Sequence, residues 1–140
     1  MQFIIEAITR RDNLTLIRFR TGEEQSVTPW GEVCLWHGDE GVAAVAAEDL
    51  EQARKAYAAF HPTAEWGYSR ILFDGIGLHG LAPLVYALLE EYPVAAVSVS
   101  DIRLGVLVPT GHADEVWLKL WSHFSPMLSA DRQIGASGAV

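Results

Sequence analysis

The sequence predicts an α/β sandwich of the α+β kind, in which a mixed, largely antiparallel sheet carries about three packed helices. Two observations lead to this prediction. Short runs rich in β-branched and aromatic residues alternate with segments whose apolar residues recur at helical spacing. Half of the 140 residues are apolar, and this length is typical of one hydrophobic core. We therefore expect a single globular domain over residues 1–130 and a flexible tail at 131–140.

Seven segments have the composition of strands. The first two, Gln2 to Thr9 and Leu14 to Arg20, flank Arg11-Asp12-Asn13, which has the composition of a turn, so we expect a hairpin there. The other runs are Val33 to Trp36, Val42 to Ala46, Arg70 to Asp74, Val94 to Ser100 and Arg103 to Val108. No internal repeat is visible in the sequence.

Three segments have the periodicity of amphipathic helices: Glu48 to Phe60, Leu81 to Tyr92, and Ala113 to about Phe124. Acidic residues begin the first and third, and prolines follow the first and second. Each helix presents one apolar stripe, which we expect to pack on one face of the sheet. Trp117 and Trp121 lie on the stripe of the third helix and are predicted to belong to the core.

The charge balance argues against two classes of partner. Ten basic residues against eighteen acidic ones give a net charge of −8, which repels nucleic acid and anionic membrane surfaces. No run approaches the roughly 18 apolar residues of a membrane-spanning helix. A single cysteine, Cys34, and the absence of a basic leader indicate a cytoplasmic protein.

The sharpest motif is Gly75-Ile76-Gly77-Leu78-His79-Gly80, which follows a predicted strand and precedes a predicted helix. This G-x-G-x-x-G pattern, with Asp101 further along, is similar to that of Rossmann-type dinucleotide-binding proteins over about a fifth of the chain. Asp74 would repel an anion at the first glycine, and little chain remains for a doubly wound sheet. A tight structural turn is therefore the favoured interpretation, and Gly75, Gly77, Gly80 and Asp101 are weak cofactor candidates.

Other catalytic chemistry has little support in the sequence. Asp74 and His79 flank the glycine turn and form the one acid/base pair worth testing. The five histidines have no metal-ligand spacing, so we expect neither a metal nor a cofactor.

Tryptophans and acidic residues suggest recognition of a protein. Trp30, Trp36 and Trp66 lie in segments too irregular to be obvious core, and large rigid indoles are enriched at interfaces. Asp39 and Glu40 form one of several pairs of adjacent acidic residues, and such pairs would attract a cationic partner. The leading hypothesis is a non-catalytic, protein-binding domain of bacterial type, an acidic inhibitor or immunity-type protein that neutralises a basic partner protein.

Three alternatives remain open at this stage. A small nucleotide-binding or acid/base enzyme would use the Gly75–Gly80 turn. A small-molecule sensor or carrier would hold its ligand between the sheet and the helices. A homo-oligomer formed through the tryptophan surface would explain the same exposed residues.

Overall fold

A computed structural model describes residues 3–20, 34–37 and 40–128, and the side chains of residues 34–37 are outside the description. In these ranges six strands form one sheet, in the order β2-β3-β1-β4-β6-β5, and every neighbouring pair is antiparallel. The strands are β1 (Ile4–Arg20), β2 (Cys34–His37), β3 (Glu40–Ala46), β4 (Thr63–Ile76), β5 (Ala96–Val99) and β6 (Arg103–Pro109). The helices of the same part of the chain are α1 (Leu50–Tyr57), α2 (Ala82–Leu88) and α3 (Thr110–Phe124). The predicted α+β class is confirmed.

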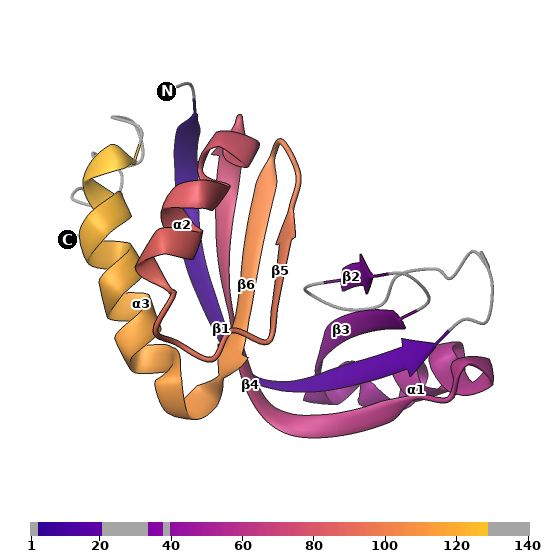
Figure 1. Cartoon of the computed structure of the whole chain (residues 1–140). Coiled ribbons are helices and arrows are strands. Elements are labelled where there is room, and N and C mark those ends of the chain that lie inside the picture. The colour runs from indigo at the N-terminus through magenta and orange to yellow at the C-terminus, as the bar shows by residue number, and fades with distance from the viewer. Residues whose placement is uncertain (1–2, 21–33, 38–39, 129–140) are drawn as a thin grey trace.

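The sheet is strongly curled, because its two long central strands bend midway (Figure 1). Helices α1, α2 and α3 lie on the convex face of the curl, while β2 and β5, at opposite ends of the strand order, approach each other on the concave side. The prediction that the helices pack on one face of the sheet agrees with this arrangement.

The curled sheet consists of two halves that share four strands and one helix in the same order, and in the described residues the second half also contains α2. The first half contains residues 14–20 of β1, then β2, β3, α1 and residues 63–67 of β4. The second half contains residues 68–76 of β4, then α2, β5, β6, α3 and residues 4–11 of β1. Residues 63–67 of β4 therefore form the outer strand of the first half, and residues 4–11 of β1 form that of the second half. Because β1 and β4 run through both halves, the two halves are parts of one continuous sheet.

The strand registers show that the halves are equivalent residue by residue. The corresponding cross-strand pairs are Leu14–Ala46 and Tyr68–Pro109 at one end, and Arg20–Glu40 and Asp74–Arg103 at the other. Residues 14–20 and 68–74 share only two identical side-chain types at matching positions, isoleucine at 17 and 71 and phenylalanine at 19 and 73. A structural repeat is thus present although no repeat was visible in the sequence.

Both long strands bend at a residue with positive φ, and the two residues are equivalent in the two halves. Asn13 in β1 has a φ of 61°, and Gly67 in β4 has a φ of 100°. The ladder between β1 and β4 shifts register beside both residues. The predicted hairpin at residues 11–13 was therefore wrong: its turn composition produces a bulge within one strand, because β1 keeps pairing with β4 on both sides of it.

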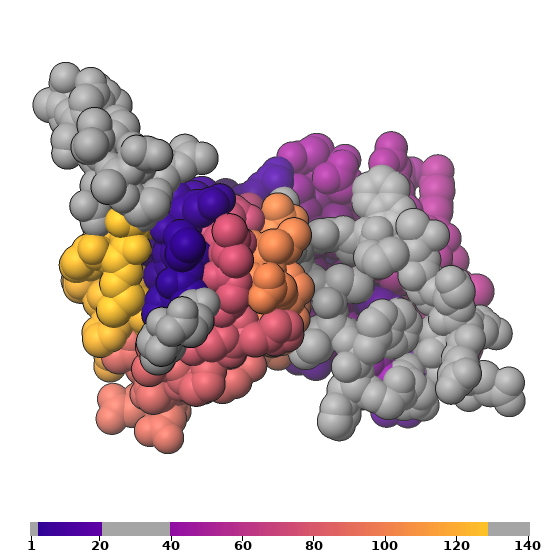
Figure 2. Space-filling view, turned by 90° about the horizontal axis from the view of Figure 1, so that it is seen from above, coloured from indigo at the N-terminus to yellow at the C-terminus, as the bar shows by residue number. Residues whose placement is uncertain are grey.

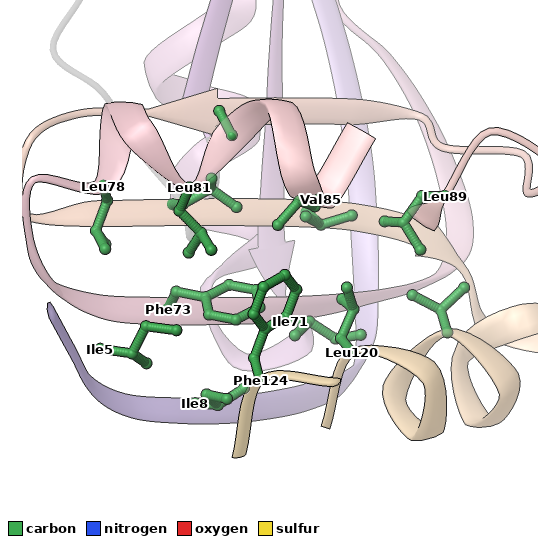
Figure 3. Close-up of a cluster of buried hydrophobic side chains, with 14 of the residues drawn as sticks. Ile5, Ile8, Ile71, Phe73, Leu78, Leu81, Val85, Leu89, Leu120 and Phe124 are labelled. Atoms are coloured by element: carbon green, nitrogen blue, oxygen red, sulfur yellow. The ribbon is translucent and has the colours of Figure 1, made fainter. Parts of the chain in front are cut away.

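Three clusters of buried side chains hold the curl together. The largest lies between the second half of the sheet and helices α2 and α3, where Phe73 meets Phe124 edge to face (Figure 3). A smaller cluster under α1 contains the stacked rings of Phe19 and Tyr57, whose centroids are 4.2 Å apart. The third cluster fills the concave side, where Leu107 of β6 joins residues of β1 and β3.

The two tryptophans of α3 only partly follow the prediction that they belong to the core. Trp117 packs against the largest cluster, whereas Trp121 remains 37% exposed and stacks on Trp117. No helix in the described part of the chain is both long and apolar enough to cross a bilayer.

Candidate functional site

The glycine turn that the sequence singled out joins β4 to α2 at one end of the second half. Seen from above, this end shows the start of β1, the end of β4 and the β5–β6 hairpin side by side, with α3 at the flank (Figure 2). A Cβ atom on Gly75 would overlap the carbonyl oxygen of Ile4, and Gly77 has a φ of 71°. Close backbone approach and left-handed backbone therefore account for these two glycines.

The amides of this turn already donate to backbone carbonyls. The Gly75 amide donates to the Ile102 carbonyl at 3.1 Å, and the Leu78 amide donates to the Asp101 carbonyl at 2.9 Å. An incoming pyrophosphate would have to displace the β5–β6 hairpin from these donors. Moreover, β6 lies between β4 and β5 in the sheet, so the βα unit differs from the adjacent parallel strands of a dinucleotide-binding fold.

The predicted acid/base pair is not brought together. The Asp74 carboxylate accepts a hydrogen bond from Nε of Arg103 at 3.0 Å, across the β4–β6 ladder. His79 is exposed on the short 3₁₀ turn before α2, and no hydrogen bond among the described residues joins it to Asp74. In the described part of the chain no group of three or more His, Cys, Asp or Glu side chains could hold a metal ion.

Of the candidates for protein recognition, Trp36, Glu40 and Trp66 lie on strands of the first half. Trp66, on β4, is 76% exposed, and Glu40 begins β3. The backbone of Trp36 lies in β2, while its side chain, like Trp30 and Asp39 as a whole, lies outside the described residues.

Glu40 belongs to a polar hollow of about 210 Å³ at the end of the first half. Its lining residues are Arg18, Phe19, Arg20, Glu40, His61 and Thr63. Arg18 and Arg20 share the concave face because side chains alternate along β1. Glu40 is the cross-strand partner of Arg20, and its carboxylate oxygens lie 3.8 Å from Arg18 and 4.0 Å from Arg20.

The charges of the hollow suit a zwitterion. Two guanidinium groups and one carboxylate line the hollow, so it offers hydrogen-bond donors to an incoming anion. The carboxylate of Glu40 is at the same time an acceptor for an ammonium group. His61 has a φ of 52° and turns the chain from the end of α1 into β4, which places Thr63 at the wall.

Sequence reasoning found one member of this hollow and missed the others. Glu40 was named as an acidic contact for a protein, whereas Arg18 and Arg20 were read only as the end of a strand. The Arg-x-Arg spacing was the available signal, since alternation in a strand places both guanidinium groups on one face. His61 was considered as one of the five histidines that have no metal-ligand spacing.

A second hollow, lined by fewer charged side chains, lies on the convex face beside α1. It has a volume of about 430 Å³ and is lined by Ile17, Arg54, Ala58, Pro62, Thr63 and Ala64. Thr63 borders both hollows, so the start of β4 forms the wall between them.

A polar network fixes the bend of the sheet to the start of α3. Asp12 accepts hydrogen bonds from Ser69 Oγ at 2.7 Å and Arg10 Nε at 2.9 Å. Arg10 also contacts Asp114 at 2.8 Å, and the Ser69 and Thr110 hydroxyls are 3.1 Å apart. The hydrogen bond from Ser69, followed by that from Arg10, holds the pKa of Asp12 below its ordinary value, because both stabilise the carboxylate.

Neither a family model nor a curated protein matches this sequence. Its fold is, however, similar to solved structures of aspartate kinases. Escherichia coli aspartokinase III in complex with aspartate and ADP matches 85% of this chain and 33% of its own, with a TM-score of 0.65 and 16% identity. The same enzyme in complex with lysine and aspartate matches 86% of this chain and 33% of its own, with a TM-score of 0.64 and 18% identity. The chain thus spans about a third of the length of these enzymes.

A third structure shows that the likeness concerns a regulatory part. The regulatory subunit of aspartate kinase from Thermus thermophilus, in a ligand-free form, matches 84% of this chain and 96% of its own. Its TM-score is 0.62 and its identity is 11%. At this level of identity the likeness shows a shared fold.

The leading interpretation from sequence was wrong. An inhibitor or immunity-type protein was expected from acidity and tryptophan content, but the structural neighbours are regulatory regions of aspartate kinases. Net charge and aromatic content describe a surface without specifying what binds to it, so they could not separate an inhibitor from a sensor.

Proposed function

We propose that this chain is a ligand-sensing regulatory domain that binds a free amino acid in the hollow of Arg18, Arg20 and Glu40. The observation that carries the proposal is the charge arrangement of this hollow, in which two guanidinium groups flank one carboxylate. The fold supports it, because the neighbours include a regulatory subunit and an enzyme solved with lysine and aspartate. This is the small-molecule sensor that the sequence left as an alternative.

The chemistry of an amino acid fits the hollow group by group. Its carboxylate would accept hydrogen bonds from Arg18 and Arg20, and its ammonium group would donate to Glu40. The hollow is small and open to solvent, so it suits a compact polar metabolite better than a nucleotide. Such a sensor would act in the cytoplasm, where free amino acids occur, and would report their concentration to a catalytic partner.

Isothermal titration calorimetry with each proteinogenic amino acid tests this proposal. At least one amino acid should bind with saturating heat. Arg20→Gln and Glu40→Gln should each lower the affinity for that ligand by roughly 10- to 100-fold, which is the effect of losing one hydrogen bond to a charged group.

The second half supplies a matched control. Asp74 and Arg103 form the equivalent cross-strand ion pair with the two charges exchanged, at a distance of 3.0 Å. Arg103→Gln should therefore leave the affinity unchanged. The proposal fails if no amino acid binds, or if Arg103→Gln weakens binding as much as Arg20→Gln.

A further inference from the structure

Besides the outer edges of β2 and β5, which end the strand order, part of β4 has a free edge in the described part of the chain. Between Thr63 and Gly67, β4 pairs with β1 alone among the described residues, because its pairing with β6 begins at Tyr68. The side chains of residues 63–66 are exposed. In the second half, the equivalent edge is the start of β1, and there Leu128 forms a parallel bridge to Ile5. Among the described residues, the start of β1 is thus bridged at Ile5, whereas residues 63–67 of β4 pair on one side only.

A large apolar side chain and a matching hollow lie along this open edge. Trp66 is the cross-strand partner of Thr15, which places its indole on the convex face that carries α1. The convex hollow is a few residues away along the same strand, lined by Pro62, Ala64 and the guanidinium-bearing Arg54. Trp66 is too exposed to fill this hollow within its own chain.

We propose that two copies of this chain pair their β4 edges antiparallel, centred on Ala64, so that Trp66 of each copy fills the convex hollow of the other. Directly opposed side chains of two paired strands point to the same face of the sheet. The register of the two copies must therefore oppose convex-face residues to convex-face residues and concave-face residues to concave-face residues. A centre at Glu65 would oppose two like charges, which is unfavourable. A centre at Ala64 opposes Thr63 to Glu65 within the open part of the strand, and it places Pro62, the residue before β4, opposite Trp66.

The proposed interface is complementary in shape and charge. The indole of Trp66 would pack on Pro62 and lie beside Arg54, an arrangement that favours a cation–π contact. On the concave face, Glu65 of the second copy would lie next to Thr63, the cross-strand partner of Arg18. Since Arg18 lines the polar hollow, the second copy would contribute an acidic group at the rim of that site. The pairing itself does not depend on amino-acid binding.

Analytical ultracentrifugation of the full chain tests the self-association. The protein should sediment as a dimer, and Trp66→Ala should raise the dimer dissociation constant by roughly 30-fold or more, as expected for an interface hot spot. Trp121→Ala, which removes a partly exposed indole from α3, is the matched control and should leave the constant unchanged.

Cysteine cross-linking tests the register. In a Cys34→Ser background, Ala64→Cys should form an intermolecular disulfide, since opposed Cα atoms at the centre of an antiparallel pair lie about 4.5–5.5 Å apart. Glu65→Cys is the register control and should not cross-link to itself, because the two sites would be diagonal neighbours at about 7–8 Å.

Three results would overturn the inference: a monomer at every concentration, a dimer insensitive to Trp66→Ala, or equal cross-linking of Ala64→Cys and Glu65→Cys. A dimer that fails to bind amino acids would remove the proposed function and leave this interface intact. Amino-acid binding by a protein that stays monomeric would remove this interface and leave the proposed function intact.

Discussion

At the scale of single residues, the bend of the sheet depends on a few polar contacts. Ser69 is fully buried, and its hydroxyl joins Asp12 of β1 to Thr110 at the start of α3. The Asp12 side chain is itself partly exposed, so solvent screens its ion pair with Arg10. Among these contacts, loss of the Ser69 hydroxyl should therefore lower the free energy of unfolding most.

Ser69→Ala should raise the pKa of Asp12 toward its ordinary value and lower the free energy of unfolding at neutral pH by about 1 kcal/mol. Because the pKa of Asp12 is lowered in the folded state, the stabilisation is present above the carboxyl's unfolded pKa and is lost as the pH falls through its folded pKa. The difference between the two proteins should thus shrink in acid. NMR titration of the Asp12 carboxyl and urea unfolding at neutral and acid pH measure both effects; an unchanged pKa would contradict the assignment.

At the scale of elements, the two long strands determine the shape of the molecule. Each bends at a positive-φ residue, Asn13 in β1 and Gly67 in β4, at equivalent places in the two halves. Asparagine tolerates left-handed backbone, whereas a φ of 100° is accessible mainly to glycine. Apart from its two chain neighbours, no described residue has a heavy atom within 4 Å of a Cβ built on Gly67, so a substitution there would test backbone conformation with little steric overlap.

Gly67→Ala should lower the free energy of unfolding by about 1 to 3 kcal/mol, because alanine is strained at this φ. Asn13→Gly should change it by less than about 1 kcal/mol, since glycine adopts the same backbone freely. Urea unfolding of both variants gives the comparison. Equal losses would show that the two bends are not governed by backbone conformation.

At the scale of the whole molecule, each half contains a strand that continues from the other, so neither half can lose its core independently. Phe19 and Phe73 occupy equivalent positions and pack on the helices of the first and second half respectively. The concave cluster adds contacts between the halves through Leu107, Leu14 and Leu16. One cooperative unfolding unit is the expected consequence.

Phe19→Leu and Phe73→Leu should each destabilise the protein by about 1 to 2 kcal/mol and reduce hydrogen-exchange protection in both halves. Leu118→Ala, at a 64% exposed position on α3, is the control and should leave protection unchanged. Hydrogen exchange followed by mass spectrometry resolves the halves separately. Loss of protection confined to the half that carries the substitution would show that the halves unfold independently.

The fold class, the three helices and most strands could be predicted from residue patterns, because alternation and helical periodicity record which side of a local element is buried. Sequence reasoning placed Arg11-Asp12-Asn13 in a hairpin turn, since turn composition alone cannot distinguish a bulge from a chain reversal. The repeat became visible only in the tertiary structure, because equivalent positions share burial and backbone conformation while their side chains differ. The polar hollow likewise became visible only in the tertiary structure. Strand register and a loop bring Arg18, Glu40 and His61 together, and the spacing of residues in the sequence predicts neither the register nor the path of the loop.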